Sequence, residues 1–435
     1  MGRKMDEQTM RACIERKRDG HELDAAEWDR IISGFMDGRI DEAQVAALCM
    51  ACVWRGMSFD EAFALTRCMV ESGEQIVFDA REGIVADKHS SGGVSDIVSL
   101  AAVPLAAACG ARIAKLSGRA LGHTGGTIDK LETIPGFNAG LTIAQFKKQV
   151  LEVGCAIAAQ SDTLVPADKR LYRLRDHTGS VPALGLIAAS IVSKKIAGGA
   201  HAFVFDVKTG PAAFMQDPSK ARELAGWLIE IAARFERRAA AFVTDMSEPL
   251  GRNIGTGVEV IEARELLRGQ GDARASELVL AIASTLVGES GFDEPEALVN
   301  RALSSGAGYE KFVQMIAAQS GDVGAFERMQ PGEPLEVCAR RSGFVQHIDV
   351  VRLGHAGRRL SMHDPLGGLR LCARIGAHVE QGEPLLHAFG RDREDAAQFV
   401  SAFSLAEEPA APPPLMYEVM INSAPSPAPA ASFKS

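Results

Sequence analysis

The 435-residue sequence predicts an α/β protein with a small helical domain made of two chain segments, a large α/β domain with a mostly parallel sheet, and a C-terminal β-rich, barrel-sandwich-like α+β domain. Three observations predict this fold. Strand-like and helix-like segments alternate through the middle of the chain, helical patterns precede and interrupt them, and short strands with glycine turns follow. The expected boundaries are 1–72 and 163–197 for the helical domain, 73–162 and 198–332 for the α/β domain, 333–408 for the C-terminal domain, and 409–435 for a Pro/Ala-rich tail.

The first helical segment shows a repeated start-and-stop pattern. Each predicted helix opens on polar residues and ends at glycine, as between Asp24, a predicted N-cap, and Gly38. In the second segment the clearest helix is "SVPALGLIAASIVSKKIAGG" at 180–199. We therefore expect one helical unit built from two separate pieces of chain.

The α/β region reads as repeated strand–helix units, which predict parallel strands. The expected strands lie within 83–90, 111–117, 155–161 and 200–210, and the expected helices within 96–110 and 141–154. After residue 333 the strings "PLEVCARRSGFVQHIDVVRLG" and "IGAHVEQGEPLL" predict strands and a hairpin. We expect the end of the tail to be disordered because it is rich in proline, alanine and serine.

Composition narrows the class of function. A net charge of −9 argues against a nucleic-acid-binding surface. The eight cysteines are scattered and mostly lie in apolar runs, which predicts buried thiols and no metal or redox site. No apolar run of about 18 residues occurs and the N-terminus is polar, so we expect no membrane segment, no signal peptide and a cytoplasmic location.

Two glycine-rich loops carry the most distinctive chemistry. The first, "DKHSSGGVSD", follows a predicted strand and opens a predicted helix, where N–H groups at the positive end of the helix dipole favour an anion. Lys88 adds a charge and Ser90 a hydroxyl, and Ser99 lies one turn into the helix. The loop is not a P-loop, because its lysine precedes the glycines.

The second loop, "SGRALGHTGGTIDKLE", has the same ingredients in another order. Lys115, Ser117 and Thr127 flank its glycines. Neighbouring parallel strands would bring both loops to the carboxyl edge of the sheet, where α/β proteins bind ligands. Either loop alone could be a simple turn, but together they predict a phosphate site.

The helix predicted at 183–197 adds a third group of polar residues. Ser190 and Lys194 stand four residues apart and share a face, and Arg175 precedes them. The lysines near the helix end could simply complement its dipole. An arginine, a serine and a lysine opposite a phosphate site would instead suit a planar ligand with carbonyl oxygens.

Four strings carry a family resemblance: "KHSSGGVSD", "SGRALGHTGGTIDKLETIPGF", "PADKRLYRLRD" and "VKTGPAAFM". They resemble the motifs of the thymidine and pyrimidine-nucleoside phosphorylases, from about residue 8 to about residue 330. The resemblance implies reversible phosphorolysis of a pyrimidine nucleoside to free base and pentose 1-phosphate, by a homodimer associating through the helical domain. It implies no cofactor, with phosphate as co-substrate; a monovalent cation held by some relatives is not predicted here, because Ser95 and Ile97 differ from their pattern.

The resemblance also implies a role for each site residue. His89, Arg175 and Lys194 would be catalytic, with His89 near O2 of the base. The base would be held by Arg175, Ser190, Lys194 and His89, and phosphate by Lys88, Ser90, Ser99, Lys115, Ser117 and Thr127.

Lys115 and three departures bear on the substrate. Relatives that accept both uridine and thymidine tend to carry lysine at the Lys115 position, which favours broad specificity. Ser95 replaces a usual glycine, and with a negative φ it would fit without strain. Pro182 and Gly185 stand where relatives have other residues, just before the base-binding helix. A strict thymidine phosphorylase and a non-catalytic nucleoside- or phosphate-binding homologue remain alternatives. A phosphoribosyltransferase of similar architecture is disfavoured, because the loops lack paired acidic residues for Mg²⁺.

Overall fold

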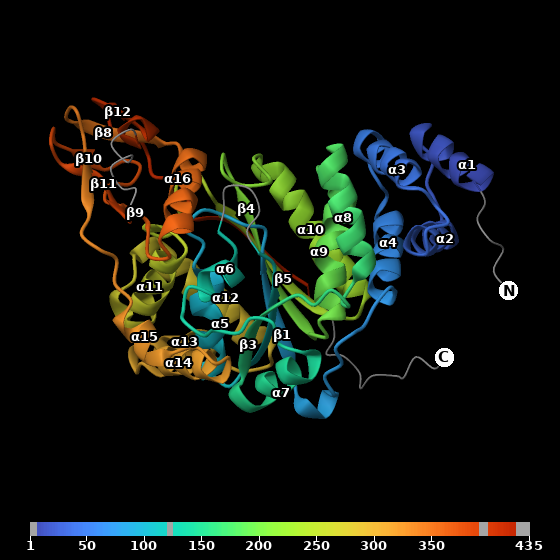
Figure 1. The fold of residues 1–435 in the computed structure, drawn as a ribbon, viewed down its shortest axis with the longest axis horizontal. Coiled ribbons are helices and arrows are strands. Elements are labelled where there is room, and N and C mark those ends of the chain that lie inside the picture. Colours follow the sequence, from blue (N-terminus) through green and yellow to red (C-terminus); the bar gives the residue numbers. More distant parts are fainter. Residues whose placement is uncertain (1–6, 120–124, 391–398, 423–435) are drawn as a thin grey trace.

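The computed structural model describes residues 7–119, 125–390 and 399–422. A six-stranded sheet occupies the middle of the molecule, with the helices α1 to α4 at one end and the C-terminal strands at the other (Figure 1). This arrangement confirms the predicted fold class: a helical part, a mostly parallel α/β part and an antiparallel C-terminal part.

The helical part joins two distant segments of chain. It comprises α1 (Glu7–Arg18), α2 (Ala25–Met36), α3 (Glu42–Arg55), α4 (Phe59–Glu71), α8 (Pro166–Thr178) and α9 (Leu184–Ala197). Asp24 forms a capping box with Glu27, and Ser58 forms one with Glu61, so α2 and α4 begin where polar side chains satisfy their first N–H groups. Helix α9 packs against α4, which unites the two segments.

The central sheet has the strand order β13-β5-β4-β1-β2-β3. Five strands run parallel: β1 (Val85–Ser90), β2 (Arg112–Ser117), β3 (Cys155–Ala159), β4 (Ala202–Thr209) and β5 (Arg238–Asp245). All of β4 is buried, as expected for a parallel strand covered by helices on both faces. The loops after β1 and β2 therefore lie side by side at one edge, as predicted.

Helices cover both faces of the sheet. Those of the α/β part are α5 (Val98–Ala108), α6 (Thr127–Leu131), α7 (Ile143–Val153), α10 (Pro218–Arg234), α11 (Gly257–Glu265), α12 (Ala273–Glu289), α13 (Pro295–Ser304), α14 (Ala307–Ala318) and α15 (Val323–Arg328). Helices α5, α12 and α14 share one hydrophobic core, whereas α9 and α10 pack on the opposite face.

In its described residues, the C-terminal part contains two antiparallel sheets and the α-helix α16. Its elements are β7 (Leu335–Cys338), β8 (Gly343–Ile348), α16 (Val350–His363), β9 (Gly368–Leu371), β10 (His378–Val379), β11 (Pro384–Phe389) and β12 (Phe403–Ala406). One sheet recruits β6 (Asn253–Gly255), a strand from within the α/β part, beside β9. The two parts are thus joined by a shared sheet. The sequence could not predict this connection, because a strand of three residues is too short to show a recognisable pattern.

The segment expected as a tail from residue 409 requires a correction. Residues Met416–Ile421 form strand β13, which pairs antiparallel with β5 and closes that edge of the central sheet. Pairing supplies backbone partners that β5 would otherwise lack on this side. The expectation of disorder concerned the end of the tail, and residues 423–435 lie outside the described residues.

The part of the chain that the structure describes lacks two kinds of feature. None of its helices combines the length and apolar character needed to cross a membrane. Likewise, no cluster of three or more His, Cys, Asp or Glu side chains in these residues is arranged to hold a metal ion. The eight cysteines are free, five of them buried and three half-buried.

Candidate active site

Strand alternation sorts the predicted residues between the two faces of the sheet. Ala86 and Ile113 belong to the core that includes α5, so the pleat directs Lys88 and Lys115 to that side as well. Ser90 and Ser117 follow two residues later on the same side. His89 alternates to the opposite side, where α9 lies. The proposed phosphate and base residues thus come from opposite faces and meet at the strand ends.

Lys88 is fully buried in a small ionic cluster. Its Nζ lies 3.1 Å from Oδ2 of Asp206, an oxygen that also lies 2.8 Å from Nζ of Lys208. The other oxygen, Oδ1, accepts a hydrogen bond of 2.6 Å from Thr244. Two buried ammonium groups therefore share one carboxylate, and Asp96, whose pKa both lysines lower, is a second negative group near them.

The Lys115 amine has no carboxylate partner among the described residues. It is 3% exposed, and its Nζ donates to the Leu116 carbonyl at 3.2 Å. The same oxygen accepts from Lys195 at 3.0 Å, while Lys195 also pairs with Asp87 at 2.7 Å. Among the described residues Lys115 makes no ion pair, and burial, followed by Lys195, lowers the pKa of Lys115 well below its ordinary value. A bound anion would raise that pKa again.

The first glycine loop is held by short-range hydrogen bonds. Ser90 Oγ donates to Asp96 at 2.5 Å and accepts from the Gly92 N–H. Burial acts to raise the pKa of Asp96, but Lys88, Lys208 and Lys130 outweigh it and hold the pKa well below its usual range. Asp96 caps Val98 at the start of α5, and Ser99 is buried in its first turn.

Ser95 requires a correction. Its φ is +57°, in the left-handed region, rather than negative as the strain-free expectation assumed. A non-glycine residue there costs on the order of 1 kcal/mol. Its buried Oγ has no hydrogen-bond partner in the described residues, so the hydroxyl does not offset the strain.

The second loop adds a residue that the sequence reading did not select. Lys130 of α6 lies 2.6 Å from Glu259 of α11 and donates to the Asp96 carbonyl at 2.8 Å, linking this loop to the first. Ser117 ends β2 and is half-buried, and Thr127 begins α6. Residues 120–124 of this loop lie outside the described residues.

On the opposite face, His89 is surrounded by cations. Burial, followed by Lys195, Lys115 and Lys194, lowers its pKa well below 6.5. Its ring meets Phe205 edge-on, with the ring centroids 6.3 Å apart. His89 is therefore neutral at neutral pH, and its imidazole can donate or accept a hydrogen bond there.

Helices α8 and α9 bring the predicted base residues together. Lys194 Nζ donates to Ser190 Oγ at 2.9 Å and lies 2.7 Å from Asp168 of α8. Tyr172 lies nearby, with Lys194 Nζ 5.9 Å from the ring centroid. The Lys194 side chain is 31% exposed, so a ligand can reach it.

Arg175 occupies a more enclosed position than its assigned role suggests. Its guanidinium donates to the backbone carbonyls of Ser180, Val181 and Leu186, and the residue is 1% exposed. Arg175 therefore stabilises the backbone of the segment that contains Pro182 and Gly185. Gly185 is required there, because a Cβ would stand 2.9 Å from the Cβ of Met57.

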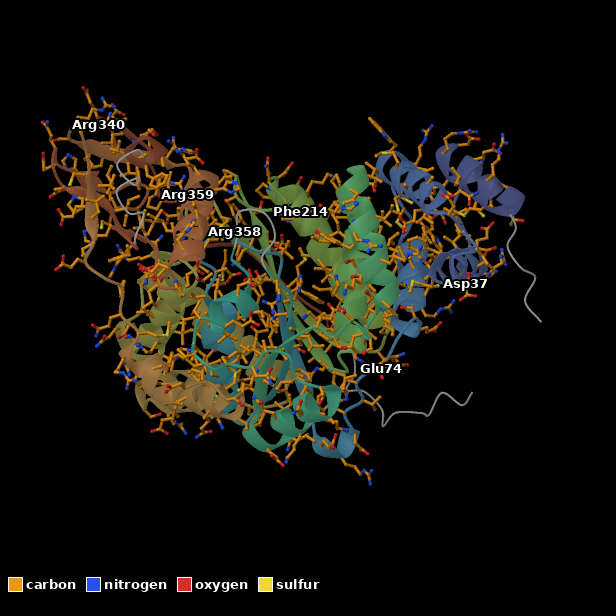
Figure 2. The ribbon with its side chains drawn as sticks, in the orientation of Figure 1. Asp37, Glu74, Phe214, Arg340, Arg358 and Arg359 are labelled. Carbon is orange, nitrogen blue, oxygen red and sulfur yellow. The ribbon has the colours of Figure 1, made fainter. Side chains whose placement is uncertain are left out.

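The residues overlooked in the sequence were charged positions in buried elements. Asp206 and Lys208 interrupt the apolar run "AFVFDVKT", and Asp87 precedes Lys88 in β1. Charged side chains inside a central strand are buried and need partners. Such residues in an apolar run are therefore a sequence signal for a functional site. Figure 2 shows Phe214, from the loop after β4, and Arg358 of α16 on the side of the molecule where these strands end.

Comparisons with known proteins agree with this architecture. Residues 82–309 match the a/b domain of the Glycosyl transferase family, and residues 11–73 match its helical bundle domain. A pyrimidine-nucleoside phosphorylase of Staphylococcus aureus strain MSSA476 is 41% identical over 427 residues, covering 94% of this chain and 99% of the relative. The chain belongs to the pyrimidine-nucleoside phosphorylase family.

Two further matches extend the comparison. The pyrimidine-nucleoside phosphorylase of Staphylococcus aureus strain USA300 is also 41% identical, over 425 residues, covering 94% of this chain and 98% of the relative. Among solved structures, an anthranilate phosphoribosyltransferase from Thermus thermophilus matches with a TM-score of 0.56 at 20% identity, covering 71% of this chain and 99% of the other. That likeness shows a shared fold only.

The lowered pKa of His89 predicts a specific pH dependence of stability. Below about pH 6.5 the unfolded state binds a proton that folded His89 refuses, so stability falls as the pH falls. We expect His89→Gln to make the loss of unfolding free energy between about pH 7 and about pH 5 shallower, by on the order of 1 kcal/mol. Denaturant unfolding across pH measures this, with exposed His21→Gln as the control. An unchanged slope in His89→Gln would show that His89 titrates normally.

Proposed function

We propose that this chain catalyses reversible phosphorolysis of pyrimidine nucleosides, releasing the free base and a (deoxy)ribose 1-phosphate, and that it accepts both uridine and thymidine. The observation that carries the proposal is the buried cluster of lysines around Leu116 and Asp206 near the strand ends, with Lys194 and Ser190 on helix α9 at the opposite face of the sheet. An inorganic phosphate would add negative charge to that cluster and favour the charged form of Lys115. A planar base would face the donors of α9.

The residues fit the charge changes of the reaction. As the glycosidic bond breaks, the sugar gains oxocarbenium character and the departing base gains negative charge. Lys194 and Ser190 supply donors already oriented by Asp168, which is the preorganised stabilisation that such a step needs. His89, being neutral, would contribute a hydrogen bond to the base. Arg175 would act through its remaining N–H groups while bracing the segment before α9.

Phosphate-dependent release of free base tests the proposal directly. Uridine, thymidine and 2′-deoxyuridine are incubated with and without phosphate, and base is quantified by chromatography. We expect release only with phosphate, and a fall in kcat/KM of about a hundredfold or more in Lys88→Ala, because Asp206 then loses a partner and the anion loses a charge. Exposed Lys169→Ala is the control. Base release without phosphate, or none from any nucleoside, would contradict the proposal.

Lys115 is proposed to set the substrate range. Lys115→Met keeps an unbranched side chain, one atom shorter, but removes the amine, and should lower kcat/KM for uridine relative to thymidine by about tenfold. Steady-state kinetics on both nucleosides, with the KM for phosphate measured in parallel, provides the test. Equal losses for both nucleosides with a raised phosphate KM would mean that Lys115 serves the phosphate alone.

We also propose that the protein is a homodimer formed through its helical part. Trp54 of α3 is 80% exposed, and a tryptophan at such exposure is typical of a contact surface. Trp54→Asp should convert the dimer to a monomer in size-exclusion chromatography with light scattering. Met362→Asp, at a position 75% exposed on α16, should leave the dimer intact. A monomeric parent, or a dimeric Trp54→Asp, would contradict this surface. The cytoplasmic location stays a prediction.

A further inference from the structure

The first glycine loop rests on a second segment that the family motifs do not include. Between β5 and β6, the N–H of Leu250 donates to the Val94 carbonyl, and the N–H of Gly251 donates to the Ser95 carbonyl, both at 3.2 Å. Gly93 lies so close to Met246 that a Cβ would stand 2.4 Å from Cε. Residues 246–251 therefore fix the position of the backbone at residues 93–95.

This supporting segment is itself held from the C-terminal part of the chain. Arg374 donates to the carbonyls of Pro249 at 2.9 Å and Leu250 at 3.0 Å. Its guanidinium also pairs with Glu248 at 3.2 Å and with Asp272 at 2.8 Å. Glu248 is 3% exposed in its side chain and accepts from the Ile375 N–H, which fixes the approach of Arg374.

We infer that Arg374 is a positioning residue for phosphate binding, acting through the 248–250 backbone on the loop at 92–96. The inference rests on the proposed phosphate site. Arg374 donates to the carbonyl of Leu250 while the N–H of Leu250 donates to the Val94 carbonyl, so a single residue separates the guanidinium from the loop. The planar fork serves two carboxylates and two carbonyls at once, which a lysine ammonium cannot do.

The loop needs such support because it is strained. Ser95 has φ +57°, and strained backbone persists only where its surroundings over-determine it. On the other side, Lys130 holds the Asp96 carbonyl at 2.8 Å. The C-terminal part also approaches the loop directly, since Gly354 and Arg358 of α16 line a small cavity together with Ser95.

Arg252 offers a matched control. It joins the same two parts of the chain and pairs with the same carboxylate, Asp272, at 2.8 Å. Its guanidinium donates to the carbonyls of Leu371 and Cys372 rather than to residues 249 and 250. Losing its side chain therefore weakens the contact between the parts without releasing the support of the glycine loop.

The test compares Arg374→Gln and Arg252→Gln in steady-state phosphorolysis, varying phosphate and nucleoside separately. We expect Arg374→Gln to raise the KM for phosphate about tenfold, the effect of misaligning one charge-assisted hydrogen bond, and to leave the KM for nucleoside within about twofold. Arg252→Gln should leave both within about twofold. Arg374→Lys should fall between, with a phosphate KM raised about threefold.

Each outcome decides the matter. A phosphate KM unchanged in Arg374→Gln, or raised equally in Arg252→Gln, overturns the positioning role while leaving the proposed function standing. A parent enzyme whose rate does not depend on phosphate overturns both. If Arg374→Gln does not fold, the same comparison is made with Arg374→Lys, and an unchanged phosphate KM in that variant overturns the inference.

Discussion

Lys88 and Lys208 share the single carboxylate of Asp206 in a place that water does not reach, and the surrounding structure follows from that shared charge. A buried ammonium group needs compensation, and one carboxylate compensates one lysine. Lys115 adds a further buried amine that forms no ion pair among the described residues, and burial lowers its pKa well below the ordinary value. Under the proposed function, a bound phosphate would complete this arrangement, and the protein would bear part of the electrostatic cost before phosphate binds.

The same constraint explains how the two faces of the sheet cooperate. The Leu116 carbonyl accepts from Lys115 on one side and Lys195 on the other, so charge on one face is felt on the opposite face. His89 stays neutral for this reason, with its pKa lowered by burial and then by these lysines. Under the proposed function, base recognition would instead fall to Lys194, which belongs to α9 and has a side chain that is 31% exposed. Phosphate and base would then meet different environments, one closed and lined by lysines, the other partly open and hydrogen-bonding.

Local chemistry explains what could be predicted from the sequence. The N-cap Asp24, the strand–helix alternation and the first glycine loop all depend on a few neighbouring residues, and each appears where expected. Contacts between distant segments could not be predicted. Strand β13 pairs with β5 across more than a hundred residues, and β6 is too short to show alternation. Ser95 has a positive φ in a backbone that hydrogen-bonds to Leu250 and Gly251, far away in the sequence. Arg175 donates to backbone carbonyls that no motif specifies.

The account is tested most directly by a crystal structure of the protein with inorganic phosphate. It predicts one phosphate at the ends of β1 and β2, within hydrogen-bonding distance of the loop at 92–96 and of at least one of Lys88 and Lys115. Phosphate bound elsewhere, or an empty site at saturating phosphate, would show that the buried lysines stabilise the sheet without binding an anion.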